Sequence, residues 1–320
     1  MKILVAGGAG YIGSVLIPKL LDRGYEVEVV DLLWFGNNLP AEVVIIKKNI
    51  INLKEEDLEG YDQVIFLAGV SNDPMAEYSP SMNFIENGAV PAYLSYTAKM
   101  AGVNRFIYGS SCSVYGYTVN ELFDENKPTV SHYPYGVSKL QGEFASMQLK
   151  DENFSVISFR QGTVSGYSPR MRLDLIVNTM FKCAVKDGEI NVNNPSIWRP
   201  VLAIKDAVAG YIRAVEADEH LSGIFNIASG NFTVGEVADY VKVAVKKYMD
   251  INTKVKIWHI DDYRNYKVST KKIMDVLGYK PLNSIDSIVK ELVDNLDKFN
   301  DFDNDSYYNI KVFKKIFPSR

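Results

Sequence analysis

Three side chains of this sequence could together move a proton to or from a hydroxyl group: Ser111, Tyr135 and Lys139. Tyr135 and Lys139 lie four residues apart in a predicted helix that begins at Pro134, so their side chains face the same way. Ser111 lies 24 residues upstream and directly follows a predicted strand. In this arrangement Tyr135 would exchange the proton, Lys139 would favour its tyrosinate form, and Ser111 would align the hydroxyl by a hydrogen bond.

The spacing of tyrosine and lysine does not by itself select this pair. Two other pairs have the same spacing, Tyr263/Lys267 and Tyr307/Lys311. What distinguishes Tyr135 and Lys139 is the hydroxyl of Ser111 at the end of a preceding strand. We therefore treat Ser111, Tyr135 and Lys139 as one candidate catalytic group.

A glycine-rich turn is predicted between the first strand and the first helix, with the spacing G-x-x-G-x-x-G at Gly7, Gly10 and Gly13. Glycines at such a turn let the backbone approach a pyrophosphate, whose charge the N-terminus of the following helix stabilises. The alternative is a turn that only packs the helix on the strand. Its position between a strand and a helix favours binding of a dinucleotide.

Asp31 follows the second predicted strand, 18 residues after Gly13. A carboxylate about 20 residues after the glycines can hydrogen-bond the 2′-hydroxyl of an adenosine ribose. The alternative is an ordinary turn residue at the end of a strand. Asp31 would repel a 2′-phosphate, and no Arg or Lys lies between it and Asn38 to neutralise one. The sequence therefore predicts NAD rather than NADP as the cofactor.

Short apolar runs alternate with segments of helical periodicity through the first half of the chain. The predicted strands are Ile3–Ala6, Glu26–Val30, Val43–Ile46, Gln63–Ala68, Arg105–Tyr108 and Ser155–Phe159. The main predicted helices between them are Tyr11–Arg23, Ser81–Ala101 and Pro134–Lys150. This alternation predicts an α/β fold with a Rossmann-type, doubly wound parallel sheet, in which ligands bind beyond the carboxyl ends of the strands.

The pattern changes after about Gly166, and we expect a second, smaller α/β lobe that binds the substrate. The predicted helices there begin at Lys205 and span Thr233–Met249 and Ile285–Phe299. Val201–Ile204 and Phe225–Ile227 could return strands to the first lobe. We divide the chain into an NAD-binding domain (residues 1–165, with returns near 200–227), a second lobe (166–299) and a C-terminal tail (300–320) of unassigned function.

Composition and charge exclude several classes of protein. The 320 residues carry a formal charge of −4, so no basic field would attract nucleic acid or an anionic membrane. The chain has two cysteines and three scattered histidines, which provide neither a disulfide framework nor a metal-ligand spacing. No apolar stretch reaches the ~20 residues of a membrane span. We expect a cytoplasmic protein without a metal.

Taken together, the motifs resemble those of the extended short-chain dehydrogenase/reductases, in the NAD-dependent nucleotide-sugar epimerase/dehydratase family. The resemblance runs from Met1 to about Phe299. Its landmarks are Gly7-Gly8-Ala9-Gly10-Tyr11-Ile12-Gly13, Leu67-Ala68-Gly69, Asn87, Ser110 to Gly116, Tyr135-Gly136-Val137-Ser138-Lys139 and Trp198-Arg199-Pro200. In this order the motifs are jointly specific for the family.

The resemblance implies roles for individual residues. It implies catalysis by Ser111, Tyr135 and Lys139. It implies cofactor binding by Gly7, Gly10, Tyr11, Ile12, Gly13, Asp31, Leu67, Ala68, Gly69, Asn87, Tyr135 and Lys139. It implies substrate binding by Ser111, Thr163, Asn178, Arg199 and Arg264, with the last three near the nucleotide diphosphate. Surface charge is the alternative for Arg199 and Arg264, and also for Arg170 and Arg172.

Departures from the family pattern bear on the reaction. Dehydratases of the family have an Asp-Glu pair directly after the serine, and Cys112 and Ser113 occupy those positions here. Neither residue can act as a carboxylate acid or base at neutral pH, which disfavours 4,6-dehydration. Asn49 replaces an aspartate that often contacts adenine. Thr163 replaces an asparagine that often contacts the sugar in epimerases.

The sequence thus predicts an NAD-dependent enzyme that oxidises a hydroxyl of a nucleoside-diphosphate sugar, most simply an epimerase acting through a transient 4-keto sugar. A 4-dehydrogenase or 4-ketoreductase of activated-sugar biosynthesis would use the same residues. A protein that binds NAD only as a sensor or scaffold is the alternative outside enzymology. The resemblance also implies a homodimer, because relatives pair helices like those at Ser81–Ala101 and Pro134–Lys150.

Overall fold

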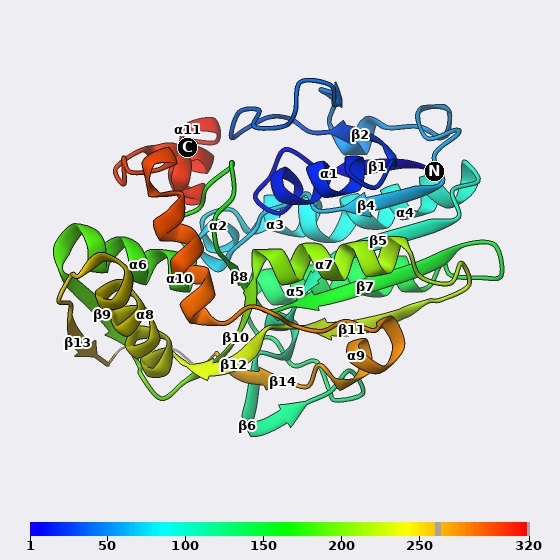
Figure 1. The fold of residues 1–320 in the computed structure, drawn as a ribbon. Helices are drawn as coiled ribbons and strands as arrows, with labels where there is room; N and C mark the ends of the chain where they lie inside the picture. Colours follow the sequence, from blue (N-terminus) through cyan, green and yellow to red (C-terminus); the bar gives the residue numbers. More distant parts are fainter. Residues whose placement is uncertain (260–263, 319–320) are drawn as a thin grey trace.

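A parallel sheet of seven strands forms the centre of the larger lobe (Figure 1). The computed structural model describes residues 1–259 and 264–318. The order of strands in the sheet is β11 (Gly223–Ile227), β7 (Ser155–Gln161), β5 (Arg105–Ser111), β4 (Gln63–Phe66), β1 (Lys2–Ala6), β2 (Glu26–Val30) and β3 (Val44–Ile46). The predicted doubly wound α/β fold is confirmed, and the order reverses between β1 and β4, where such sheets bind ligands.

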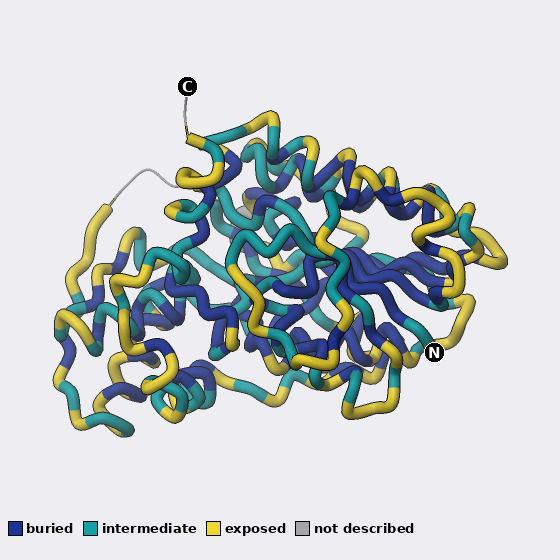
Figure 2. Tube along the Cα trace, turned by 90° about the horizontal axis from the view of Figure 1, so that it is seen from above, coloured by how far each residue is buried: buried dark blue, intermediate teal, exposed yellow. Residues whose placement is uncertain are grey.

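Helices cover both faces of this sheet. On one face lie α1 (Gly13–Leu21) and α7 (Ile204–Val215), which pack against each other. On the other lie α4 (Val90–Met100) and α5 (Pro134–Met147). The central strands are therefore buried on both sides, as the dark blue strands of Figure 2 show.

The sequence predicts one continuous helix over Ser81–Ala101, and the structure divides it. It contains α3 (Pro80–Phe84), a π-helical turn (Ile85–Ala89) and α4. Pro91 has no N–H to donate to the carbonyl of Asn87 four residues earlier. The hydroxyl of Tyr108 on β5 donates to that carbonyl instead, at 3.0 Å. The helix is thus widened into a π-helical turn directly before the turn that contains Pro91.

The second lobe is built from small sheets and three long helices around its own apolar core. Its long helices are α6 (Ile176–Asp187), α8 (Val234–Met249) and α10 (Ile285–Asp294). The shorter helices α2 (Asp73–Tyr78) and α9 (Lys271–Leu277) pack on the larger lobe, and α11 (Asn309–Ile316) lies against α2. The small sheets pair β8 (Thr163–Ser165) and β12 (Gly230–Thr233) with β10 (Trp198–Ala203), β9 (Glu189–Asn193) with β13 (Lys254–Trp258), and β6 (Tyr117–Phe123) with β14 (Asn265–Val268).

Two segments that sequence analysis left open are now placed. Residues 223–227 return to the main sheet as its edge strand β11, whereas residues 198–203 form β10 in a separate sheet. The tail folds back so that α11 lies against α2 (Figure 1). We keep the division at residues 165/166 and 299/300 as a proposal. No helix within the described residues is long and apolar enough to cross a bilayer.

A buried ion pair fixes α5 on the sheet. The Arg160 guanidinium on β7 donates to both carboxylate oxygens of Glu143 on α5, at 2.7–3.1 Å, and neither side chain is more than 3 % exposed. Arg160 also donates to the hydroxyl of Tyr115 at 2.8 Å. Glu143 lies one turn beyond Lys139 and two turns beyond Tyr135 on the same helix face. The pair therefore sets the position of α5 relative to the strands.

Removal of one partner of the Glu143–Arg160 ion pair should destabilise the folded protein. We expect Arg160→Met to lower the free energy of unfolding by about 3–5 kcal/mol, because the Glu143 charge would remain buried without its partner. Urea denaturation followed by circular dichroism measures the change. The exposed pair Lys271–Asp275 gives the control, and Lys271→Met should change stability by less than about 0.5 kcal/mol. An equally small loss for Arg160→Met would contradict this interpretation.

Candidate active site

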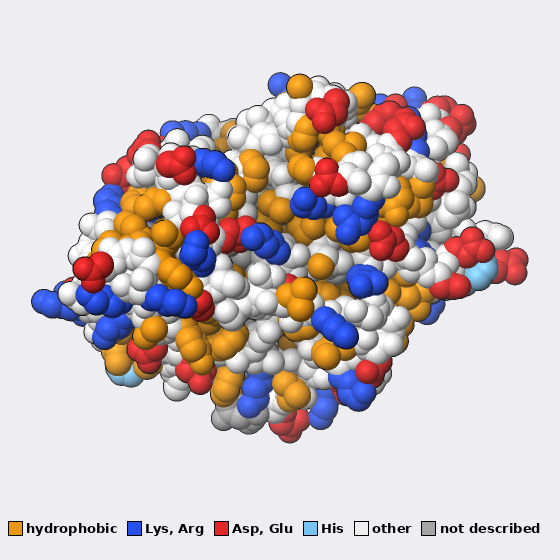
Figure 3. Space-filling model, in the orientation of Figure 1, with side chains coloured by type: hydrophobic (Ala, Val, Ile, Leu, Met, Phe, Trp, Pro, Cys, Tyr) orange, Lys and Arg blue, Asp and Glu red, His pale blue; other side chains and the backbone are white. Residues whose placement is uncertain are grey.

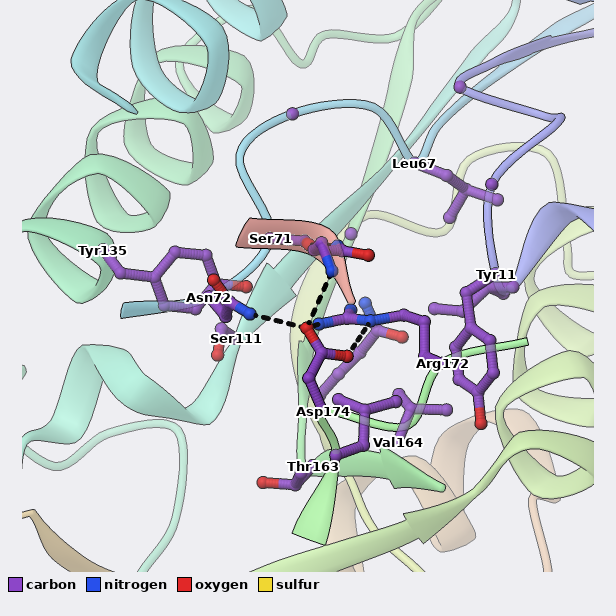
Figure 4. A pocket seen from close by; sticks show the side chains of 18 of the residues that line it. Tyr11, Leu67, Ser71, Asn72, Ser111, Tyr135, Thr163, Val164, Arg172 and Asp174 are labelled. Atoms are coloured by element: carbon purple, nitrogen blue, oxygen red, sulfur yellow. Dashed lines mark hydrogen bonds and ion pairs between the residues drawn. The ribbon is translucent and has the colours of Figure 1, made fainter. Parts of the chain in front are cut away.

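One cavity of about 690 Å³ lies beyond the carboxyl ends of the strands, between the two lobes. The segments at the carboxyl ends of β1, β4 and β5 line it on one side, and residues of the second lobe line it on the other (Figure 4). The predicted residues that line it are Gly7, Gly10, Tyr11, Ile12, Gly13, Asp31, Leu67, Ala68, Gly69, Ser111, Tyr135, Lys139, Thr163, Arg199 and Arg264. Folding thus brings the glycine turn and the candidate catalytic group into one space.

The glycine turn is shaped by close packing. Gly7 has a φ of +77°, and a Cβ atom there would lie 2.5 Å from the backbone of Ala68. A Cβ atom on Gly13 would lie 2.1 Å from the carbonyl oxygen of Gly8. Side chains are therefore excluded from both positions, and bare backbone at the start of α1 borders the cavity. These residues fit the pyrophosphate of a dinucleotide.

Asp31 lies at the carboxyl end of β2 and holds two loops together. Its carboxylate accepts hydrogen bonds from the backbone N–H groups of Ala9, at 3.1 Å, and Leu33, at 2.7 Å. Burial raises the pKa of Asp31, and the positive charge of Arg170 opposes this rise. The sequence neighbourhood of Asp31 contains no such cation, because Arg170 arrives from the second lobe. A ribose hydroxyl at this wall would still meet a carboxylate.

Ser111 ends β5 and caps the short helix that follows, where its Oγ accepts from the N–H of Ser113 at 3.1 Å. Tyr135 lies in the first turn of α5 and lines the same cavity as Ser111. Figure 4 shows both side chains at the same side of the cavity. The predicted serine and phenol therefore border one space.

Lys139 lies one turn after Tyr135, and its Nζ donates to the carbonyl of Gly109 at 2.9 Å. Burial lowers the pKa of Lys139 to about 8. Burial also raises the pKa of Tyr135 above its usual range, and the positive charge of Arg172 opposes this rise. The role expected of Lys139 stays a prediction.

Arg170 and Arg172 are buried in the cavity wall, so the surface-charge interpretation is wrong for both. Arg172 makes a two-pronged ion pair with Asp174, at 2.9 and 3.1 Å, and Asp174 also accepts from Asn72 at 3.0 Å (Figure 4). The guanidinium of Arg170 lies 3.7 Å from the ring centroid of Phe35. The segment after β8 thus places positive charge in the cavity.

Arg264 and Arg199 lie at the second-lobe side of the cavity. Arg264 forms an ion pair with Asp73 at 2.5 Å, and Arg199 donates to the carbonyls of Trp198 and Arg264. The guanidinium of Arg199 also lies 5.5 Å from the ring centroid of Tyr266. Tyr263, which precedes Arg264 in the family motif and forms one of the alternative tyrosine–lysine pairs, lies outside the described residues.

Two predicted binding residues lie behind the cavity wall rather than in it. Asn178 is fully buried, accepts from the N–H of Gly166 and donates to the hydroxyl of Tyr11. Asn87 is also fully buried and donates to the carbonyl of Val70 at 2.8 Å. Because both side-chain nitrogens donate within the protein and neither residue lines the cavity, direct contact with a ligand is not what the structure shows for either residue. Their geometry supports a positioning role.

The two residues that follow Ser111, Cys112 and Ser113, are not carboxylates. Cys112 points away from the cavity, where its Sγ donates to the carbonyl of Arg160 at 3.1 Å, and burial raises the pKa of its thiol. Ser113 lines the cavity and exchanges a hydrogen bond with Tyr266 at 3.2 Å. Cys112 is therefore a small residue packed behind the cavity wall.

Sequence reasoning missed several residues of the wall. They come from the loops after β2 and β4, from the second lobe and from the tail: Trp34, Phe35, Ser71, Asn72, Asp73, Asp174, Asn309 and Ile310. No motif marks them, and only the fold brings them together. Basic and acidic side chains are interspersed over the face shown in Figure 3, as the balanced composition predicts.

Comparisons with known proteins agree with this geometry. The profile of the "NAD dependent epimerase/dehydratase family" matches residues 3–228. A UDP-glucose 4-epimerase of Corynebacterium glutamicum is 25% identical over 301 residues, with 88% of this chain and 91% of that protein covered. UDP-glucuronic acid decarboxylase 6 of Arabidopsis thaliana is 27% identical over 308 residues, with 88% and 84% covered.

Among solved structures, UDP-glucuronic acid 4-epimerase of Bacillus cereus, in complex with UDP-glucuronic acid and NAD, has the same fold. The TM-score is 0.81 at 23% identity, with 93% of this chain and 99% of that chain covered. The family match covers most of the chain and includes the glycine turn and the candidate catalytic group. The chain belongs to the NAD dependent epimerase/dehydratase family and is an enzyme whose cofactor is NAD.

Proposed function

We propose that this enzyme is a nucleotide-sugar epimerase that acts through a transient 4-keto sugar. The observation that carries the proposal is the meeting of Ser111, Tyr135 and Lys139 with the glycine turn in one cavity. The family includes decarboxylases and dehydratases besides epimerases. The reaction must therefore be argued from the residues around Ser111.

Proton transfer in this mechanism takes place at the hydroxyl of Tyr135. In its tyrosinate form that oxygen takes the proton of the sugar hydroxyl and later returns it, while Ser111 holds the sugar oxygen by a hydrogen bond. The positive charge of Arg172 eases the passage through tyrosinate, since it opposes the rise in the pKa of Tyr135. When bound, NAD supplies the acceptor and donor of the hydride. Lys139, held by Gly109, lies where it can orient the nicotinamide ribose.

The lack of a carboxylate at positions 112 and 113 favours epimerisation over dehydration. A dehydratase must protonate a leaving hydroxyl and remove a neighbouring proton, which needs an acid and a base. Cys112 is buried against Arg160, and Ser113 has only a hydroxyl. The 4-keto sugar therefore meets no group at these positions that could eliminate water. Return of the hydride to its other face completes an epimerisation.

The substrate we propose is a UDP-sugar. The relatives described above act on UDP-glucose or UDP-glucuronic acid, or bind the latter. Arg199 and Arg264 supply cations at the second-lobe side, and Arg170 and Arg172 supply two more in the wall. Planar guanidinium groups suit the paired oxygens of a diphosphate. Thr163 would border the sugar.

We also propose a homodimer joined through α4 and α5. Tyr96 and Met100 on α4 and Phe144 on α5 are each about half exposed. Three large apolar side chains on neighbouring helices mark an interaction surface. We propose a cytoplasmic location on the basis of the two unpaired cysteines, Cys112 and Cys183.

The proposed reaction is tested by incubating the purified enzyme and NAD with UDP-glucose, with its 4-epimer UDP-galactose, and with UDP-glucuronic acid and its 4-epimer. Proton NMR follows each sugar while absorbance follows NADH. A change of configuration at C4 without net NADH is the expected result. Stoichiometric NADH would instead show a dehydrogenase, turnover only of an added 4-keto sugar with NADH a ketoreductase, and loss of carbon dioxide a decarboxylase.

Substitution of the proposed acid–base residue should stop the chemistry but spare the fold. We expect Tyr135→Phe to lower kcat about 10²–10⁴-fold, because the phenol oxygen that moves the proton is gone. NADH binding, followed by fluorescence, should stay within about threefold of the parent enzyme. The control is Tyr96→Phe on the exposed face of α4. Full activity of Tyr135→Phe would contradict the assigned role.

Burial of Lys139 should carry a cost in stability that depends on pH. Its pKa is about 8 in the folded protein and about 10.4 when unfolded, so below pH 8 the folded state bears the full cost of a buried charge. Between pH 8 and 10 the folded state loses the proton first, and its stability rises. Without NAD, Lys139→Met should exceed the parent by about 1–3 kcal/mol at pH 7, with a gap that closes toward pH 10.

Thermal and urea unfolding at pH 7, 8.5 and 10 measure this gap, and the exposed Lys271→Met variant is the control. A constant gap at all three values would show that burial of the Lys139 charge is not its cause. The same Lys139→Met variant should have lost activity. The same substitution would then raise the stability of the protein and abolish its activity.

A charge on the proposed dimer surface should separate the subunits. We expect Met100→Asp with Phe144→Asp to convert a dimer to a monomer in light scattering, since a desolvated carboxylate on each helix opposes apolar contact. Val243→Asp, at an exposed position of α8, is the matched control. A parent protein that is monomeric at the same concentration would refute the dimer proposal.

A further inference from the structure

The C-terminal segment, residues 305–318, packs against the loops that border the cavity. It consists of a short 3-10 helix (Asp305–Tyr307) and α11. The carbonyl of Tyr307 accepts from the N–H of Leu173 in the second lobe, at 2.9 Å. Asn309 and Ile310 at the start of α11 line the cavity itself. The tail, to which the sequence analysis assigned no role, is thus part of the cavity wall.

Apolar contacts fasten α11 to the first lobe. Phe313 is fully buried against Val70 and the α2 residues Met75 and Ala76. Its ring centroid lies 6.0 Å from that of Trp34, which belongs to the loop after β2. The hydroxyl of Tyr78, the last residue of α2, donates to the carbonyl of Phe317 at 2.9 Å. One helix therefore bridges the loops that follow β2 and β4.

Polar contacts fasten the same helix to the cavity wall through Asn309. Its side-chain oxygen accepts from Arg170 and its side-chain nitrogen donates to Ser71, both at 2.5 Å. Its backbone N–H donates to Asp174 at 3.3 Å. Asn309 is only 4 % exposed. A single residue of the tail thus joins the loop after β4 to two charged residues of the second lobe.

These contacts lie at the loops that border the proposed cofactor site. A dinucleotide that reaches from Asp31 at the end of β2 to Ser111 at the end of β5 must pass the end of β4, which lies between them in the sheet. The loops after β2 and β4 border that path, and α11 ties them together. We propose that the C-terminal segment is a strap that retains the bound dinucleotide, which cannot leave until α11 separates from Trp34 and Ser71.

This inference rests on the proposed function and adds to it. An epimerase of the proposed kind returns the hydride to the sugar that gave it, so the reduced cofactor must stay in place between the two steps. A dehydrogenase must instead release NADH at each turnover. Slow exchange of the dinucleotide is therefore a property that the proposed reaction needs, and the strap supplies a structural means for it.

Release of NADH tests the strap without reference to activity. The full-length enzyme is loaded with NADH and mixed with a large excess of NAD, and the decay of NADH fluorescence gives the rate of release. Phe313→Ala removes the anchor of α11 without touching the cavity, and the exposed Ile316→Ala on the same helix is its control. We expect Phe313→Ala to speed release at least about tenfold and Ile316→Ala to change it less than about twofold.

Asn309→Ala provides a second variant that keeps the apolar anchor, with the exposed Asn300→Ala as its control. We expect it to speed release about 3- to 10-fold, because two buried hydrogen bonds to the loops are lost. A folded Phe313→Ala enzyme that releases NADH within twofold of the parent rate would overturn the strap. If that variant does not fold, Asn309→Ala decides by the same criterion. A parent enzyme that binds no NADH would overturn the proposed function and the strap together.

Discussion

The buried ion pair between Glu143 and Arg160 is the constraint on which the arrangement of the active site depends. Two opposite charges in an apolar interior are tolerated only when each is paired and hydrogen-bonded. Here the requirement is met by contacts that reach well beyond the pair. Arg160 also donates to the hydroxyl of Tyr115, and that hydroxyl donates to the side-chain oxygen of Asn226 on β11 at 2.8 Å. Helix α5 can satisfy this network in one position only, and Lys139 and Tyr135 extend from the same face one and two turns away.

The glycine turn likewise depends on the second lobe. The hydroxyl of Tyr11, within the turn, donates to the carbonyl of Gly166 at 2.6 Å, and Ser168 donates back to the carbonyl of Tyr11 at 2.8 Å. Asn178 completes this junction from α6. The glycine turn and the segment that follows β8 are therefore built as one unit. This explains why Asn178 is buried rather than free to contact a ligand.

Local patterns predicted the elements that carry the chemistry. The strand β2 and the start of α5 lie where the sequence placed them, because apolar runs, glycines and prolines act over a few residues. The same reasoning could not find Arg170 beside Asp31 or Asn309 beside Ser71, since these contacts join segments that only the tertiary fold brings together.

The hydroxyl of Tyr108 has a consequence for how this chain can vary. It lies 3.0 Å from the carbonyl of Asn87 and 3.3 Å from that of Lys139, so one oxygen serves the irregular turn before α4 and the helix that carries the catalytic residues. Its bond to Asn87 stands in for the N–H that Pro91 lacks. Substitutions at positions 91 and 108 should therefore affect each other. A phenylalanine at 108 would be better tolerated once residue 91 is no longer proline, and the order in which the two changes occur would matter.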